Sequence, residues 1–319
     1  MLLRSGCAAF LTVATATALA AYPDRPVRLV VPFAPGGNID ITARTVAPGL
    51  TAELGQPVVV ENRGGAGSRI GNEFVAKSAP DGYTMLLGST GTMSINTVFV
   101  TKPTYDARRD FVPTSLVSIT PMVLVTHPSL PVKTAQQFIA LAKAKPGSIL
   151  LASAGTGSNT HLTGELFQLI TGVKLTHVPY KGAGPALVDL MGGQTQCFFD
   201  QVSTSVPLVS SGKLRAIAVA AGTRSFMLRD VPTMAESGVR DFEASASAGI
   251  FLPSATPKDI VNRVYTALIR VLDRPATRDA FARLGAEVIK TTPAEVNKRL
   301  AADIAKWEKV QQRTGLRLD

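Results

Sequence analysis

The sequence of 319 residues predicts an α/β fold organised in two lobes. Three observations lead to this class. Short apolar segments alternate with amphipathic helical segments at the start of the chain, the same alternation begins again after residue 120, and the end of the chain contains helices without a sheet of their own. Alternating strands and helices are typical of doubly wound, mostly parallel sheets.

The first unit has the order β-α-β-α-β. A helix that runs toward Leu54 is expected, with Asn38 or Asp40 as its N-cap, and a second helix is expected near Ser68–Lys77. Pro48 is expected to kink or shorten the first helix because proline has no N–H to donate. Three apolar segments are the predicted strands: Val27–Val31, Val58–Val60 and Tyr83–Leu87.

The second unit is longer. Its predicted strands are Met122–Thr126, Ile149–Ala152, Leu175–Val178, Cys197–Phe199 and Leu214–Ala220. Its predicted helices are Thr134–Lys145, Asn159–Thr171, Ala183–Met191 and Val206–Ser211. After Pro232 one strand, near Ser247–Leu252, precedes three helices that begin near Pro257, Pro275 and Pro293, where the missing N–H of proline costs nothing.

The last three helices must pack on a sheet made elsewhere in the chain. The simplest arrangement is a discontinuous first lobe, residues 21–120 plus 235–319, with residues 121–234 inserted as the second lobe. Two chain crossings, near Ser118–Pro121 and Met234–Ser245, would then form a hinge. A ligand is expected in the cleft between the lobes.

Residues 1–20 have the pattern of a secretory signal peptide. Arg4 provides the positive charge, residues 8–19 form the apolar region, and Ala18-Leu19-Ala20 matches an A-x-A cleavage site. The apolar region is shorter than a membrane span, which argues against an N-terminal anchor. Cleavage would remove Cys7 and leave Cys197 without a disulfide partner in an exported protein.

Charge and motifs exclude several classes of function. The net charge is +10, or +9 after cleavage, but the basic residues are scattered and aromatic residues are only 6%, so a nucleic-acid partner is not expected. The sequence contains no CxxC motif, no HExxH motif and no Cys/His cluster, so a metal site is not expected. Neither a phosphate-binding loop nor a dinucleotide fingerprint is present, so no cofactor is expected.

Glycine- and hydroxyl-rich loops follow several predicted strands, including the polar loop Gly88–Gly91. Ligands of parallel sheets bind at this edge, where helix N-termini offer free N–H groups that suit a carboxylate. No residue is assigned a catalytic role. The candidate ligand-binding residues are Phe33, Ala34, Gly36, Gly37, Asn38, Asp40, Ser89, Thr90, Ser153, Gly155, Thr156, Gly157, Ser158, Asn159, Thr160, Tyr180, Lys181, Gly182 and Asp200.

Five other interpretations concern single side chains. His161 and His177 are expected to pack or hydrogen-bond rather than to act as bases. Lys181 either meets an anion or faces water. Asp200 would not attract an anion, but it would orient a loop donor or meet an amine or hydroxyl of the ligand. Trp307 has the spacing of a core residue on the last helix.

The loops resemble those of a known family. Residues 31–40 look like its Pro-Phe-x-x-Gly-Gly-x-x-Asp loop, and further similar motifs follow in the same order. The family is the Bug (TctC-like) extracytoplasmic solute receptors of tripartite tricarboxylate transporters. The further motifs are Val60–Arg63, Gly65–Gly67, Ala79–Thr84, Ser153–Leu162, His177–Gly182 and Asp230–Thr233.

The resemblance implies a periplasmic binding protein of the Venus flytrap type, acting as a monomer. It implies a small carboxylate ligand, such as a dicarboxylate, tricarboxylate, aromatic acid or acidic amino acid, held by backbone amides and waters. It also implies a membrane permease as partner. Two segments depart from the family pattern: Ser245–Ala248 replaces bulky aromatic residues that often wall the cleft, and Met93–Asn96 lacks a common histidine.

Two alternative functions remain open at this stage. A sensory protein that signals to a partner would use the same cleft. A hydrolase would pair Ser153 or Ser158 with His161, although no Gly-x-Ser-x-Gly motif is present.

Overall fold

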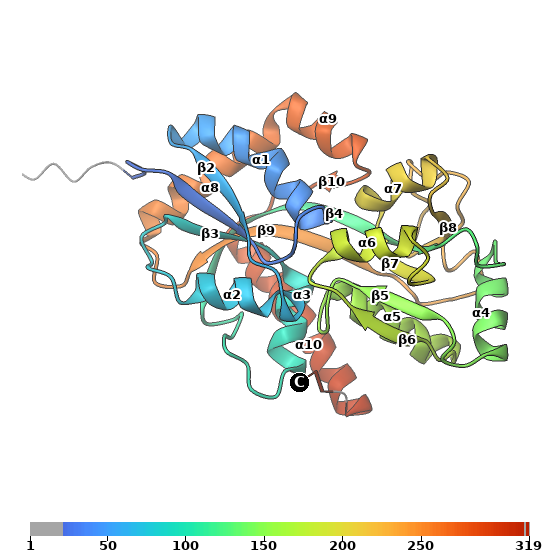
Figure 1. Cartoon of the computed structure of the whole chain (residues 1–319). Coiled ribbons are helices and arrows are strands. Elements are labelled where there is room, and N and C mark those ends of the chain that lie inside the picture. Colours follow the sequence, from blue (N-terminus) through green and yellow to red (C-terminus); the bar gives the residue numbers. More distant parts are fainter. Residues whose placement is uncertain (1–21, 316, 319) are drawn as a thin grey trace, which may run out of the picture.

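The computed structural model describes residues 22–315, 317 and 318 (Figure 1). The predicted signal peptide, residues 1–20, lies outside the described residues. Within the described part of the chain, no helix combines the length and the apolar character needed to cross a membrane.

Lobe 1 is built on a mixed sheet. Strand β1 pairs in parallel with β2 and β3, β9 adds antiparallel to β3, and the first part of β4 adds antiparallel to β9. Helices α1, α8 and α9 lie on one face and α2, α3 and α10 on the other (Figure 1). The elements are β1 Val27–Val31, α1 Asn38–Leu54, β2 Val58–Asn62, the 3₁₀ turn η1 Ala66–Ser68, α2 Arg69–Ala76, β3 Thr84–Ser89, α3 Thr90–Phe99, β4 Phe111–Thr126, β9 Ser245–Pro253, α8 Lys258–Asp273, α9 Pro275–Arg283, β10 Glu287–Val288 and α10 Pro293–Thr314.

Lobe 2 repeats this plan. Strand β5 pairs in parallel with β6 and β7, and the second part of β4 pairs antiparallel with β7 and β8. Helices α6 and α7 lie above this sheet in the view of Figure 1 and α5 below it. The elements are α4 Ala135–Ala144, β5 Leu150–Ser153, α5 Asn159–Thr171, β6 Thr176–Pro179, α6 Ala183–Met191, β7 Cys197–Gln201, α7 Val202–Ser210 and β8 Arg215–Val219.

Two strands carry the chain between the lobes. The 16-residue strand β4 belongs to both sheets, and β9 pairs with it from Phe111↔Pro253 to Pro121↔Ser245. The crossing therefore consists of paired backbone rather than of two loose linkers. The predicted fold class, two-lobed α/β with helix-covered sheets and two crossings, is confirmed, with antiparallel strands added beside the parallel ones.

Some local expectations were wrong. Helix α1 is not shortened at Pro48, because its apolar side chains Val46 and Leu50 are fully buried against the core and hold the helix together. The N-cap of α1 is Gly37, not Asn38 or Asp40. The predicted polar loop at residues 88–91 is instead the end of β3 and the start of α3.

Candidate ligand-binding site

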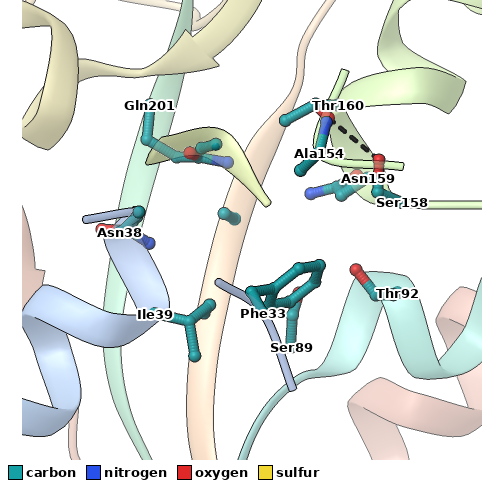
Figure 2. A pocket seen from close by; sticks show the side chains of 13 residues that line it. Phe33, Asn38, Ile39, Ser89, Thr92, Ala154, Ser158, Asn159, Thr160 and Gln201 are labelled. Carbon is teal, nitrogen blue, oxygen red and sulfur yellow. Dashed lines mark hydrogen bonds between the residues drawn. The ribbon is translucent and has the colours of Figure 1, made fainter. Parts of the chain in front are cut away.

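A cavity lies between the two lobes, next to the crossing strands (Figure 2). Asn38 and Gln201 mark one end of it, and Thr92, Ser158 and Asn159 mark the other. Phe33 projects between these ends, and Ile39 lies on the same side as Asn38. The lining residues are Phe33, Gly37, Asn38, Ile39, Ser89, Thr92, Ala154, Ser158, Asn159, Thr160, Ala183, Gln201 and Ala246.

Five helices begin at this cavity. Its lining includes the N-cap residues of α1, α3, α5 and α7 and the first residue of α6. Only α5 is capped by a side chain, that of Ser158, which accepts from the His161 N–H. The other four N-termini keep N–H groups without a side-chain cap, and the positive ends of five helix dipoles meet here.

The cavity has helix N-termini in its wall but no charged side chain in the described lining. None of the thirteen described residues that line it carries a charge. Two buried polar atoms in the lining, Asn38 Nδ2 and Ser89 Oγ, have no hydrogen-bond partner within the described chain. Buried polar groups are normally paired, so both atoms are free to bind a guest.

The space is narrow. About 30 Å³ is open to the centre of a water-sized sphere, whereas a single water needs about 10–15 Å³. The wall includes Phe33 on the lobe 1 loop and Ala246 on β9. In this structure the cavity therefore has room for only a few waters.

The nineteen candidate residues fall into three groups. Seven line the cavity: Phe33, Gly37, Asn38, Ser89, Ser158, Asn159 and Thr160. Five border a groove on the outer surface, where the two lobes meet: Ala34, Gly155, Thr156, Tyr180 and Lys181. Seven belong to neither lining: Gly36, Asp40, Thr90, Ser153, Gly157, Gly182 and Asp200.

Asp40 supports the first loop from below. Its carboxylate accepts hydrogen bonds from the Gly36 N–H at 3.0 Å and the Asn62 amide at 2.9 Å, and it pairs with Arg44 at 3.0 Å. Burial works to raise the pKa of Asp40, but these bonds outweigh burial and hold the pKa below its usual value. The carboxylate therefore stays charged and fixes the loop.

Asp200 is fully buried behind the cavity wall. It accepts from the hydroxyls of Thr204 at 2.6 Å and Ser205 at 2.8 Å, while its Oδ1 has no partner among the described residues. Burial raises the pKa of Asp200 to about 6. The next residue, Gln201, lines the cavity instead, because successive side chains of a strand point to opposite faces.

The two histidines organise the first loop of lobe 2. The rings of His161 and His177 are stacked 3.9 Å apart. His177 Nε2 lies 2.6 Å from Ser153 Oγ, and His161 Nδ1 accepts from the Gly157 N–H at 3.2 Å. Burial lowers the pKa of His161 to about 3 and that of His177 to about 4, so both rings are neutral at pH 7. Ser153 thus bonds to His177. The hydrolase alternative, in its Ser153 form, requires a bond to His161 instead.

The loops of the two lobes meet backbone to backbone. We call this contact the glycine seam: residues 33–37 and 64–67 of lobe 1 against residues 155–157 and 180–184 of lobe 2. The Ala34 N–H donates to the Lys181 carbonyl at 2.9 Å. A Cβ at Gly184 would lie 2.1 Å from the Pro35 carbonyl oxygen, and one at Gly67 2.0 Å from that of Thr156. Glycine at both positions therefore allows the lobes to touch.

Six lining residues escaped the sequence analysis. Ile39, Ala154, Ala183 and Gln201 directly follow candidate positions, and this adjacency is the signal that would have found them. Thr92 belongs to the polar segment that follows the third predicted strand, although only Ser89 and Thr90 of that segment were candidates. Ala246 comes from a crossing strand, where the sequence carries no loop signal.

A two-lobed α/β fold with an uncharged cavity ringed by helix N-termini defines a solute-binding protein of the periplasmic class. Residues 42–316 match the model of the tripartite tricarboxylate transporter family receptors (TctC). The chain belongs to this family, which confirms the resemblance to Bug receptors.

Three relatives illustrate the similarity. Protein BugT of Bordetella pertussis is 40% identical over 298 residues, covering 93% of this chain and 91% of BugT. The structure of the periplasmic binding protein BugD is 36% identical with a TM-score of 0.89, covering 93% and 99% of the two chains. The structure of R. palustris Rpa4515 with adipate is 35% identical with a TM-score of 0.89, covering 93% and 99%.

Proposed function

We propose that this protein is a periplasmic receptor that captures a small organic carboxylate in the cavity between its lobes and delivers it to a membrane permease. The observation that carries the proposal is the convergence of five helix N-termini on a cavity without charged side chains. A carboxylate complements such a site, and the relative bound to adipate supports this ligand class.

The interactions on offer are sufficient for a useful affinity. A hydrogen bond to a charged group contributes about 1.5–3 kcal/mol, and a helix dipole adds about 0.3–1 kcal/mol. Micromolar binding corresponds to about 8 kcal/mol. Four to six donors from uncapped N-termini, Asn38 and Ser89 therefore provide enough, before the entropy cost of binding.

In the proposed cycle the acid enters between separated lobes and the glycine seam closes over it. We keep the lobe boundaries at residues 21–120 plus 235–319 and 121–234, with cleavage of the signal peptide after Ala20. The candidate residues of the lining contact the acid. The others hold the loops in place or form the seam.

A thermal-shift screen of organic acids, including adipate and succinate, tests the proposal. At a concentration of 100 Kd, a bound acid stabilises the protein by about 2.7 kcal/mol. Amines and alcohols with the same carbon skeletons should give no shift. If no acid stabilises the protein, or if the amines do so equally, the proposal is wrong.

A pair of variants adds a control. Asn38→Asp places a negative charge in the cavity and should abolish the shift with acids. Asn297→Asp makes the same charge change at an exposed position outside the cavity and should preserve it. Co-purification of the protein with a permease, rather than with a sensor protein, would identify the partner.

A further inference from the structure

We propose that Ser203 and Thr120 fix the orientation of the Asn38 amide, so that its N–H donors face the ligand and select a group that accepts hydrogen bonds. Asn38 then determines specificity, and the two hydroxyl residues are positioning residues. The inference rests on the proposed function, which it deepens, because it names the groups that recognise one end of the acid.

Three elements meet at the Asn38 side chain. Asn38 begins α1 of lobe 1, Ser203 lies in the first turn of α7 of lobe 2, and Thr120 lies on the crossing strand β4. The Oδ1 atom accepts from Ser203 Oγ at 2.7 Å and from Thr120 Oγ1 at 3.4 Å. All three side chains are at most 4% exposed.

The opposite atom of the amide is unused. Nδ2 is buried, has no partner within the described chain, and belongs to a residue of the cavity lining, at the end shown beside Gln201 in Figure 2. A buried, unpaired N–H group is costly, so a guest that supplies an acceptor is favoured. A carboxylate oxygen does so, whereas an ammonium group would leave the amide unpaired.

A hydroxyl can donate or accept, so Ser203 and Thr120 hold this orientation of the amide together with an acceptor in the cavity. A rotated amide would present its carbonyl oxygen to the ligand, and two oxygen acceptors would face each other without a proton. With Ser203 and Thr120 donating to Oδ1, every polar group in the cluster is paired once an acceptor occupies the cavity.

The strongest of these bonds depends on closure. Ser203 belongs to lobe 2 and Asn38 to lobe 1, so the 2.7 Å bond forms only when the lobes are together. The amide is then locked at the step at which the ligand becomes enclosed. A ligand with the wrong chemistry is rejected because the closed state would contain an unpaired donor.

A double-mutant cycle tests the inference, with adipate and succinate as probes in calorimetric titrations. Ser203→Ala should weaken binding about tenfold, or about 1.4 kcal/mol, in the otherwise unaltered protein. In an Asn38→Ala background the same change should weaken binding less than twofold. Ser203→Thr keeps a hydroxyl and should restore affinity, and Ser210→Ala, at an exposed serine of the same helix, should change nothing.

The outcomes are decisive in each direction. Equal losses from Ser203→Ala in both backgrounds would show that Ser203 acts through general structure and would overturn the inference, as would no loss in either. A failure of the proposed function is distinguishable, because the unaltered protein would then bind neither acid. In that event a neutron structure still decides: Nδ2 hydrogens directed at Ser203 and Thr120 contradict the inference, and hydroxyl hydrogens directed at Oδ1 support it.

Discussion

Replacing Gly184 by alanine asks whether the glycine seam must close to hold the ligand. Gly184 is the second residue of α6, and the added Cβ would lie 2.1 Å from the Pro35 carbonyl oxygen, although ordinary contacts begin at 3.4 Å. The two backbones must therefore separate by about 1.3 Å. Alanine favours a helix over glycine by about 0.5–1 kcal/mol, so α6 itself should not be weakened.

The separation has a calculable consequence. The hydrogen bond from the Ala34 N–H to the Lys181 carbonyl, now 2.9 Å, would stretch beyond bonding distance. Losing one such bond costs about 0.5–1.5 kcal/mol, which corresponds to a two- to about tenfold weaker affinity for the acid. The acid-bound protein should also remain more open.

Calorimetric titration and small-angle X-ray scattering of the acid-bound protein measure both effects. Gly192→Ala, at the other end of the same helix, is the matched control, because its Cβ would lie 3.5 Å from the nearest carbonyl oxygen. If Gly184→Ala binds the acid as tightly as the unaltered protein and has the same radius of gyration, closure of the seam does not contribute to binding.

Three further predictions concern buried groups outside the cavity. Because the pKa of Asp200 is raised to about 6, its contribution to stability is lost as the pH rises through 6. In denaturant unfolding, Asp200→Asn should therefore stabilise the protein by about 3 kcal/mol at pH 8 and little at pH 4. Equal effects at both pH values would contradict this. The pKa of His161 is lowered to about 3, so its contribution to stability is present above pH 6.5 and is lost as the pH falls. From pH 7 to 5 the free energy of unfolding should fall by about 2 kcal/mol through this residue. His161→Asn, which can still accept from the Gly157 N–H, should remove that part of the pH dependence of the unfolding free energy, and an unchanged pH dependence would refute the prediction. Cys197→Ser should lower the free energy of unfolding by no more than about 1 kcal/mol, because the hydroxyl can donate to the Leu150 carbonyl that the thiol now faces at 3.7 Å. A fall in melting temperature of more than about 5 °C would contradict the prediction.

The sequence was a good guide where periodicity and chain order decide the structure. The apolar segments at Val27–Val31 and Cys197–Phe199 became central strands, and the loops after parallel strands met at one edge as expected. Helix α3 was missed because Ser89, Thr90 and Gly91 have the composition of a turn. Buried residues such as Phe99 stabilise this helix by packing against the core, and the local sequence does not reveal that packing.

The role of the glycines could not be read from the sequence. A glycine in a loop signals that something approaches closely, but not what approaches. Gly182 was expected to admit a ligand, whereas a Cβ there would lie 2.8 Å from the Ala34 backbone nitrogen of the other lobe. Asp200 and Gln201 show a second limit, since a shift of one residue along a strand changes which side chain faces the cavity.

The paired crossing strands restrict how the molecule can open. Because β4 and β9 are hydrogen-bonded to each other up to Pro121 and Ser245, the two strands must bend together, and neither can rotate independently. A two-stranded ribbon bends easily across its flat face and resists shear and torsion. The lobes should therefore separate by one rotation, on the side opposite the paired strands, and a captured molecule should leave by the route through which it entered.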